Sequence, residues 1–150
     1  MGCDIHSHAE RRVGDHWQEV RTEREPFGDR SYGVFGFLAG VRNYSAVPPI
    51  AEQRGTPADA DEPVREQMDG LHSCSWLSVE ELAAFDYDAP MEDRRCTRRM
   101  PAGYLSGGET CDLGEGTMTT FRDFLGSQFF DDLAMLQEAG AERVVFGFDS

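Results

Sequence analysis

The sequence contains no lysine, so every one of its 14 basic residues is an arginine, set against 28 aspartates and glutamates. The formal net charge is therefore −14 at pH 7. A chain of this charge is repelled by a phosphate backbone and by an anionic membrane surface, so we expect no general nucleic-acid binding and no membrane partner. Missing lysines are typical of a GC-rich genome, and the strong negative charge is typical of halophilic proteins.

Long apolar runs and paired cysteine motifs are also missing. No segment approaches the roughly 18 apolar residues of a membrane-spanning helix, and the opening residues do not form a signal peptide. The four cysteines have no Cys-x-x-Cys spacing, so we expect reduced thiols and a cytoplasmic protein. A zinc site built from Cys96 and Cys111 stays open as an alternative.

Alternating and helical patterns predict an α+β fold that forms one domain over residues 1–150. The predicted strands are 3–10, 17–22, 72–76 and 143–148, and the predicted helices are 31–42, 63–70, 78–85 and 120–139. Gly14 and Asp15 form a turn signal between the first two strands. We expect a small, mostly antiparallel sheet, made from this N-terminal hairpin and the C-terminal strand, with helices packed on one face.

Glycines mark two further segments. Five glycines fall within residues 87–118, where we expect an irregular excursion that acts as a mobile flap. Gly33, Gly36 and Gly40 lie on one stripe of the predicted helix 31–42, where each glycine costs up to about 1 kcal/mol relative to alanine. The stripe indicates that another backbone or a ligand approaches closely.

The first polar constellation lies in the opening strand. Side chains at alternate positions of a strand share a face, so Asp4, His6, His8 and Glu10 lie together, about 6.5–7 Å from one to the next. Carboxylates and neutral imidazoles so arranged can coordinate Zn²⁺ or Mn²⁺ and activate a bound water molecule. A solvated strand face that holds two histidines is the structural alternative.

The second constellation lies in and around the predicted strand 72–76. His72 is a candidate general acid or base, and Ser73, Ser75 and Trp76 are candidate ligand-binding residues. The alternative is a structural histidine beside a core tryptophan.

Arginines in polar contexts form a third set of candidates. Arg30, Arg42 with Asn43, and Arg54 could each hold a phosphate, because the planar guanidinium matches its geometry. Tyr32 and Trp76 could stack a nucleobase, although salt bridges and core packing account for such residues equally well. The acidic residues concentrate in 51–93, and four arginines follow within six residues: Arg94, Arg95, Arg98 and Arg99.

Five segments together resemble a family of small proteins of bacteriophages and other prokaryotic viruses. They are MGCDIH (1–6), RSYGVFGFLAGVRN (30–43), RGTP (54–57) with Asp59, HSCSWL (72–77) and VFGFD (145–149). The resemblance implies a viral accessory protein that works in the host cytoplasm on a host nucleotide signal. The short run DIHSH also resembles the first metal motif of the polymerase-and-histidinol-phosphatase and amidohydrolase families, which are metal-dependent hydrolases.

The leading hypothesis is a metal-dependent phosphodiesterase that acts on a nucleotide or nucleotide-derived signal. Asp4, His6 and His8 would hold a divalent metal, Glu10 and His72 would be catalytic, and the arginines would neutralise the phosphate. The first alternative is a homo-oligomeric sponge that sequesters a small anionic, nucleotide-like ligand without cleaving it. The second is an acidic decoy of a host nucleic-acid-binding protein.

Overall fold

A computed structural model describes residues 2–99 and 105–150, which form two compact units. Unit 1 comprises residues 2–30, Glu52–Phe85 and Ser127–Ser150. Unit 2 comprises Ser31–Ala51 and, apart from residues 100–104, Asp86–Gly126. The single-domain organisation stays a prediction, and each unit is described by itself below.

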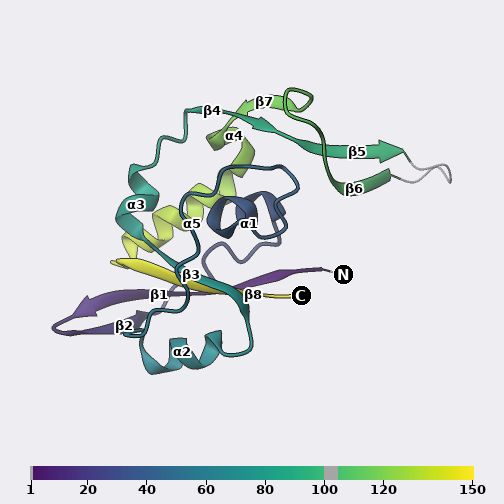
Figure 1. Ribbon diagram of the computed structural model, residues 1–150. Helices are drawn as coiled ribbons and strands as arrows, with labels where there is room; N and C mark the ends of the chain where they lie inside the picture. Colours follow the sequence, from purple (N-terminus) through teal and green to yellow (C-terminus); the bar gives the residue numbers. More distant parts are fainter. Residues whose placement is uncertain (1, 100–104) are drawn as a thin grey trace. The chain divides into compact units, whose positions relative to one another are not determined.

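Unit 1 contains a four-stranded antiparallel sheet with the order β2-β1-β8-β3 (Figure 1). The strands are β1 (Asp4–Val13), β2 (His16–Val20), β3 (His72–Ser78) and β8 (Arg143–Asp149). A two-residue turn joins β1 to β2, with Gly14 at φ +63°, and so confirms the predicted hairpin. The C-terminal strand β8 lies between β1 and β3, and all its residues except Asp149 are buried. The predicted α+β class and antiparallel sheet are confirmed.

Both faces of this sheet are covered by helices. The helices of unit 1 are α2 (Glu62–Met68), α3 (Val79–Ala84) and α5 (Ser127–Glu138). Val145 of β8 packs against Val64 and Met68 of α2. Helices α3 and α5 lie on the other side of the sheet (Figure 1). The prediction of helices on one face therefore needs a correction, because α2 is amphipathic enough to bury Val145 from the opposite side.

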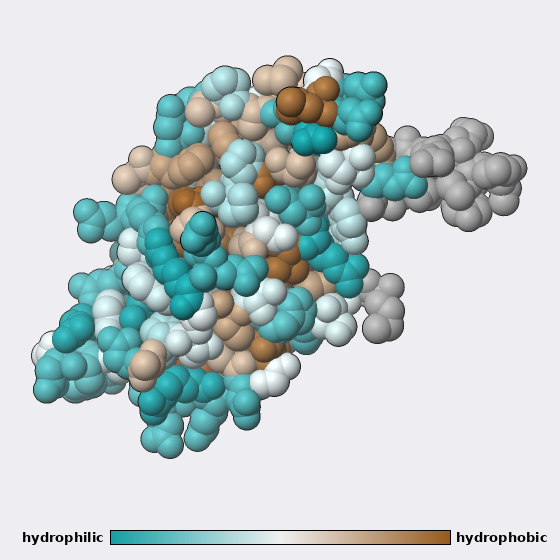
Figure 2. Space-filling view, in the orientation of Figure 1, coloured by the Kyte–Doolittle hydropathy of each residue, from teal (hydrophilic) through white to brown (hydrophobic). Residues whose placement is uncertain are grey.

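The alternation predicted for the opening strand is confirmed. Ile5, Ser7 and Ala9 are buried and pair in register with Phe148, Phe146 and Val144 of β8. The residues between them share the face of Val145 and Gly147, which is the face that α2 partly covers. In the space-filling view, the side chains over α2 and the β1–β2 hairpin are mainly hydrophilic (Figure 2). Of the candidate polar residues of β1, Asp4, His6 and His8 are half-buried, whereas Glu10 is buried.

Unit 2 combines two helices with two short antiparallel ribbons. The helices are α1 (Tyr32–Ala39) and α4 (Phe121–Leu125). The ribbons pair β4 (Pro90–Asp93) with β7 (Thr117–Thr120), and β5 (Arg95–Arg99) with β6 (Leu105–Thr110). The prediction of an irregular excursion at 87–118 is therefore corrected. These four short strands pair with each other and not with the four-stranded sheet. Their sequences do not alternate between apolar and polar residues, which is the pattern that predicts a strand, so they could not be located from the sequence.

The glycine stripe of α1 accommodates side chains of unit 2. A Cβ atom at Gly33 would lie 3.0 Å from the ring of Phe124, and one at Gly36 would lie 2.5 Å from Oδ1 of Asn43. Gly40 ends the helix in the left-handed conformation, with φ 71°. The close approach predicted there is confirmed, but side chains of the same chain make it, rather than another backbone or a ligand.

Among the described residues, no helix is long and apolar enough to cross a membrane. All four cysteines are free thiols. Cys96 and Cys111 lie together, and the hydrogen bond between their thiols raises the pKa of Cys96 to about 11.

Candidate active site

The exposed face of β1 begins with Asp4 and His6. Arg30 donates two hydrogen bonds to the Asp4 carboxylate, both of 2.8 Å, which hold the pKa of Asp4 below its usual range. His6 donates from Nε2 to Oδ2 of Asp149 over 2.7 Å. Asp4, His6 and Arg30 are thus brought together, at the end of the sheet where β8 finishes.

The predicted metal ligands are each engaged by a different protein partner. Asp149, the partner of His6, belongs to β8, whereas Glu19, the partner of His8, belongs to β2 on the other side of β1. The two imidazoles are therefore drawn towards opposite neighbours. In the described part of the chain, no three His, Cys, Asp or Glu side chains form a group that could hold a metal ion. The Zn²⁺ or Mn²⁺ site stays a prediction, and no step below passes through it.

Glu10 lies in the interior of unit 1. Its side chain is fully buried, and its Oε1 accepts a 2.8 Å hydrogen bond from Arg143. Its Oε2 accepts from the backbone N–H of Asp61 over 2.7 Å. The Arg143 guanidinium lies 3.8 Å from the ring centre of Trp17 and 5.8 Å from that of Trp76. This arrangement makes Glu10 the counterion of a buried arginine, and its removal would leave that charge buried without compensation.

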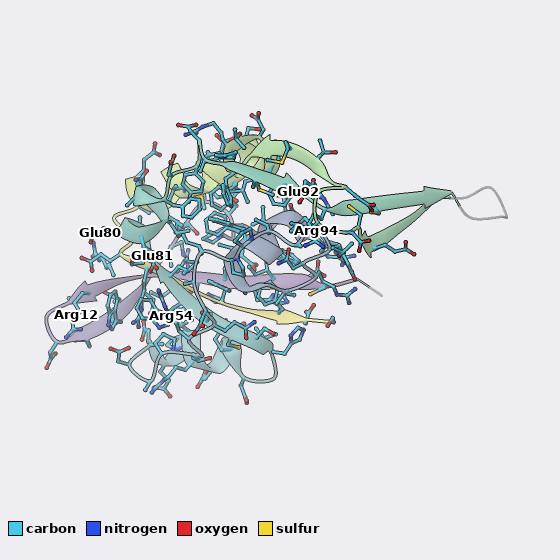
Figure 3. The ribbon with its side chains drawn as sticks, turned by 45° about the horizontal axis from the view of Figure 1, so that its top comes forward. Arg12, Arg54, Glu80, Glu81, Glu92 and Arg94 are labelled. Carbon is cyan, nitrogen blue, oxygen red and sulfur yellow. The ribbon has the colours of Figure 1, made fainter. Side chains whose placement is uncertain are left out.

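Arg54 is paired rather than open to a ligand (Figure 3). Its two terminal nitrogens donate 2.8 Å hydrogen bonds to the two carboxylate oxygens of Glu81. Its guanidinium also lies 4.6 Å from the ring centre of Trp76. The hydrogen bonds from Arg54, helped by the backbone N–H of Ser78, hold the pKa of Glu81 at about 2, against the effect of burial. Glu81 also forms, with Ser78, the capping box that begins α3.

This ion pair predicts acid sensitivity with a defined origin. Because the pKa of Glu81 is lower in the folded than in the unfolded chain, its contribution is complete above the ordinary value of 4.5 and is lost as pH falls towards 2. We expect Arg54→Met to flatten the fall of the urea midpoint across that window. Arg65→Met is the control, because Arg65 donates only to the carbonyl of Ala58 among the described residues. Equal pH slopes in the two variants would refute this assignment.

The residues around His72 differ in their burial and in their hydrogen-bond partners. His72 pairs with Phe148, so it lies on the face opposite to that of His6 and His8. Its Nδ1 lies 3.0 Å from Oγ of Ser73. Ser75 is buried, and its Oγ accepts the backbone N–H of Arg54. Ser75 thus has a structural role, whereas Ser73 lies beside the ring of His72.

Tyr32, Arg42 and Asn43 form a separate group in unit 2. The Arg42 guanidinium lies 5.6 Å from the ring centre of Tyr32, and its NH1 donates to the Tyr44 hydroxyl over 3.4 Å. The Asn43 amide donates to the carbonyl of Val47 and accepts its N–H, which closes a turn. Asn43 thus has a local structural role, whereas Arg42 with Tyr32 stays a candidate binding pair.

His8 lines a cavity of about 620 Å³ within unit 1, which lies in the size range of small-molecule sites. We call it the His8 cavity, and its lining is formed by Ser7, His8, Ala9, Glu19, Val20, Arg21, Thr22, Glu23, Arg24, Glu25 and Pro26. Its outer wall is the segment after β2. That wall is held to β1 because the Ser7 N–H donates to Glu25 over 2.9 Å and the Ser7 hydroxyl donates to the carbonyl of Pro26.

The His8 cavity combines a histidine–carboxylate pair with an arginine. His8 Nδ1 lies 2.6 Å from Oε2 of Glu19, and an ionised carboxylate can only accept, so the proton resides on Nδ1. Nε2 is then the basic nitrogen. Arg21 forms no hydrogen bond, ion pair or ring contact with the described residues. Arg24, by contrast, donates to the buried carboxylate of Asp132 over 2.7 Å.

Glu19 and Arg21 are site residues that the sequence-based prediction missed. A usable signal exists, because the two-residue turn at Gly14 and Asp15 sets the register of the hairpin, in which Glu10 pairs with Glu19. If this register continues two positions further from the turn, Arg21 lies opposite His8. Glu19, which pairs with Glu10, is then the diagonal neighbour of His8.

Comparison of the chain with protein-family models, with curated proteins and with solved structures finds no match.

Proposed function

We propose that this protein is a hydrolase that binds a small, nucleotide-like phosphodiester in the His8 cavity. The observation that carries the proposal is the joint presence there of the His8–Glu19 pair and Arg21, an arginine with no partner among the residues that the structure describes. A guanidinium forms charge-assisted hydrogen bonds with phosphate oxygens, and a histidine oriented by a carboxylate is a common general base. The resemblance to small viral proteins supports an accessory role towards a host nucleotide signal.

The charge of the lining favours a diester over more highly charged phosphates. Glu19, Glu23 and Glu25 line the cavity together with Arg21 and Arg24. Because Arg24 is already paired with Asp132, the carboxylates outnumber the remaining arginine. A phosphodiester carries one negative charge per phosphorus, whereas a monoester or a triphosphate carries more and is repelled more strongly. We therefore expect diesters, such as those of cyclic dinucleotides, to be the preferred substrates.

The proposed reaction uses the imidazole of His8 and the guanidinium of Arg21. Nε2 of His8 accepts a proton from a water molecule as its oxygen forms a bond to phosphorus. The phosphorus–oxygen bond to the leaving group breaks, and the leaving alkoxide takes the proton from the imidazolium. Arg21 stabilises the negative charge that develops on the phosphoryl oxygens. Glu19 keeps the imidazole in the required tautomer and stabilises its protonated form.

The test compares bis(p-nitrophenyl) phosphate with p-nitrophenyl phosphate, alongside c-di-AMP and c-di-GMP, using the full chain. We expect diester cleavage that persists in EDTA, with little monoester cleavage. Saturable binding of a dinucleotide without turnover would overturn hydrolysis in favour of the sponge. Activity only with added Zn²⁺ or Mn²⁺ would overturn water activation by His8 alone and support the metal site predicted from Asp4, His6 and His8.

A further inference from the structure

The second reactive arrangement in unit 1 lies at the start of β3, on the opposite face of the sheet from His8. Oγ of Ser73 lies 3.0 Å from Nδ1 of His72, and Nε2 of the same ring lies 3.0 Å from Oγ of Ser150. The three groups form one hydrogen-bonded chain. His72 is exposed, and Ser73 is partly exposed, so a small molecule can reach both.

The backbone at Ser73 is held in an unfavourable conformation. Its φ is +54°, a left-handed conformation that residues other than glycine, asparagine and aspartate rarely adopt. The cause is local, because the register between β3 and β8 shifts between His72 and Ser75. Such irregularities in a strand redirect a side chain, and they are frequent beside active sites. Here the irregularity turns the Ser73 hydroxyl towards the ring of the preceding residue.

The ring of His72 also has contacts with Phe148 and Ser150, which fix its position. It lies 6.2 Å from the ring of Phe148, centre to centre, and Phe148 is fully buried. When Nε2 carries the proton and donates it to Ser150, Nδ1 is left as the acceptor that faces Ser73. Ser73 is then the nucleophile, His72 is the base and Ser150 is the group that orients the base, which is the arrangement that activates a serine hydroxyl.

We propose that Ser73 is a nucleophile, activated by His72, that takes up the acyl group of a small activated ester. Nδ1 of His72 accepts the hydroxyl proton as Oγ bonds to the acyl carbon. The bond from that carbon to the leaving alcohol breaks, and the alcohol takes the proton from His72. Water then attacks the acyl carbon by the same route, releases the acid and restores the serine. This activity is separate from phosphodiester cleavage in the His8 cavity.

The test uses a fluorophosphonate, the phosphorus analogue of an activated ester, on the full chain. Oγ bonds to phosphorus, the phosphorus–fluorine bond breaks, fluoride departs and His72 keeps the proton. We expect one stable adduct on Ser73, located by peptide mass spectrometry, and a labelling rate at least 10-fold lower in His72→Asn. The absence of an adduct, or an adduct on another residue, overturns the proposal.

Ser73→Gly separates the chemical role from a structural one. Glycine adopts positive φ without steric cost, so we expect this variant to unfold at a higher urea concentration than the natural chain while the adduct is lost. Labelling that continues unchanged in Ser73→Gly refutes the assignment of the nucleophile.

Discussion

Replacement of Glu10 with alanine is expected to destabilise the protein by about 3–5 kcal/mol, because it leaves a buried arginine without its counterion. Glu10 is fully buried and Arg143 is 5% exposed. After the substitution, the carboxylate partner that Arg143 retains among the described residues is Asp59, which is 61% exposed and accepts a 3.2 Å hydrogen bond. That single contact does not offset the loss of solvation of a guanidinium held between two tryptophans.

The expected loss is a large part of the stability of a domain, which is about 5–15 kcal/mol. For a chain of this length it corresponds to a fall in the melting temperature of roughly 6–20 °C. Urea unfolding monitored by tryptophan fluorescence measures it directly, since Trp17 and Trp76 flank the ion pair. Glu66→Ala is the matched control, because Glu66 is exposed on α2, and we expect it to change the stability by no more than about 0.5 kcal/mol.

A double replacement distinguishes a buried ion pair from general core disruption. Glu10→Leu combined with Arg143→Met removes both charges and retains apolar volume between the tryptophans. We expect it to be more stable than Glu10→Ala, because buried ion pairs are often replaced by apolar residues without loss. If the double variant is less stable than Glu10→Ala, or if Glu10→Ala costs under about 1 kcal/mol, this description of the cluster is wrong.

The second large effect is expected at His8. His8→Asn keeps a donor near Glu19 but removes the basic nitrogen that the proposed mechanism requires. We expect kcat/KM for bis(p-nitrophenyl) phosphate to fall by roughly 10²- to 10⁴-fold, which is the usual contribution of general base catalysis. The circular dichroism spectrum and the urea midpoint should stay close to those of the natural chain, because His8 lies at the cavity wall rather than in the core.

His16→Asn is the matched control for this substitution. His16 also lies beside a carboxylate, with Nδ1 3.5 Å from Asp15, but it lies at the hairpin turn and does not line the His8 cavity. We expect unchanged kinetics in this control. A similar kcat/KM in both variants would show that neither histidine is the base.

The sequence was sufficient to predict the face that carries the candidate residues. Strict alternation over residues 3–10 sets Asp4, His6, His8 and Glu10 on one side of β1, and the structure confirms this arrangement. The predicted helices 63–70 and 78–85 agree with α2 and α3 to within two residues at each end, whereas the predicted helix 120–139 is divided at Gly126 into α4 and α5. These features are local, so the pattern within about ten residues determines them.

The partners of those residues could not be predicted, because tertiary pairing determines them. Asp149 and Arg143 reach β1 because β8 lies between β1 and β3. The apolar run 144–148 is typical of a strand buried on both faces, but it does not specify which strands are its neighbours. Burial likewise separates Glu10 from His8, although they are neighbours on the same face. Alternation specifies the side of a strand but not the depth at which a side chain lies.

The most direct test of the account measures the binding of a small phosphodiester in the His8 cavity. Isothermal titration with a phosphorothioate cyclic dinucleotide compares the natural chain with Arg21→Met and Arg11→Met. Both variants remove one positive charge, but Arg11 is exposed and does not line the cavity. We predict that Arg21→Met raises Kd by roughly 10- to 100-fold, as the loss of a charged hydrogen bond implies, while Arg11→Met leaves Kd almost unchanged. Equal Kd values for the two variants, or no saturable binding to the natural chain, would contradict the assignment of this cavity.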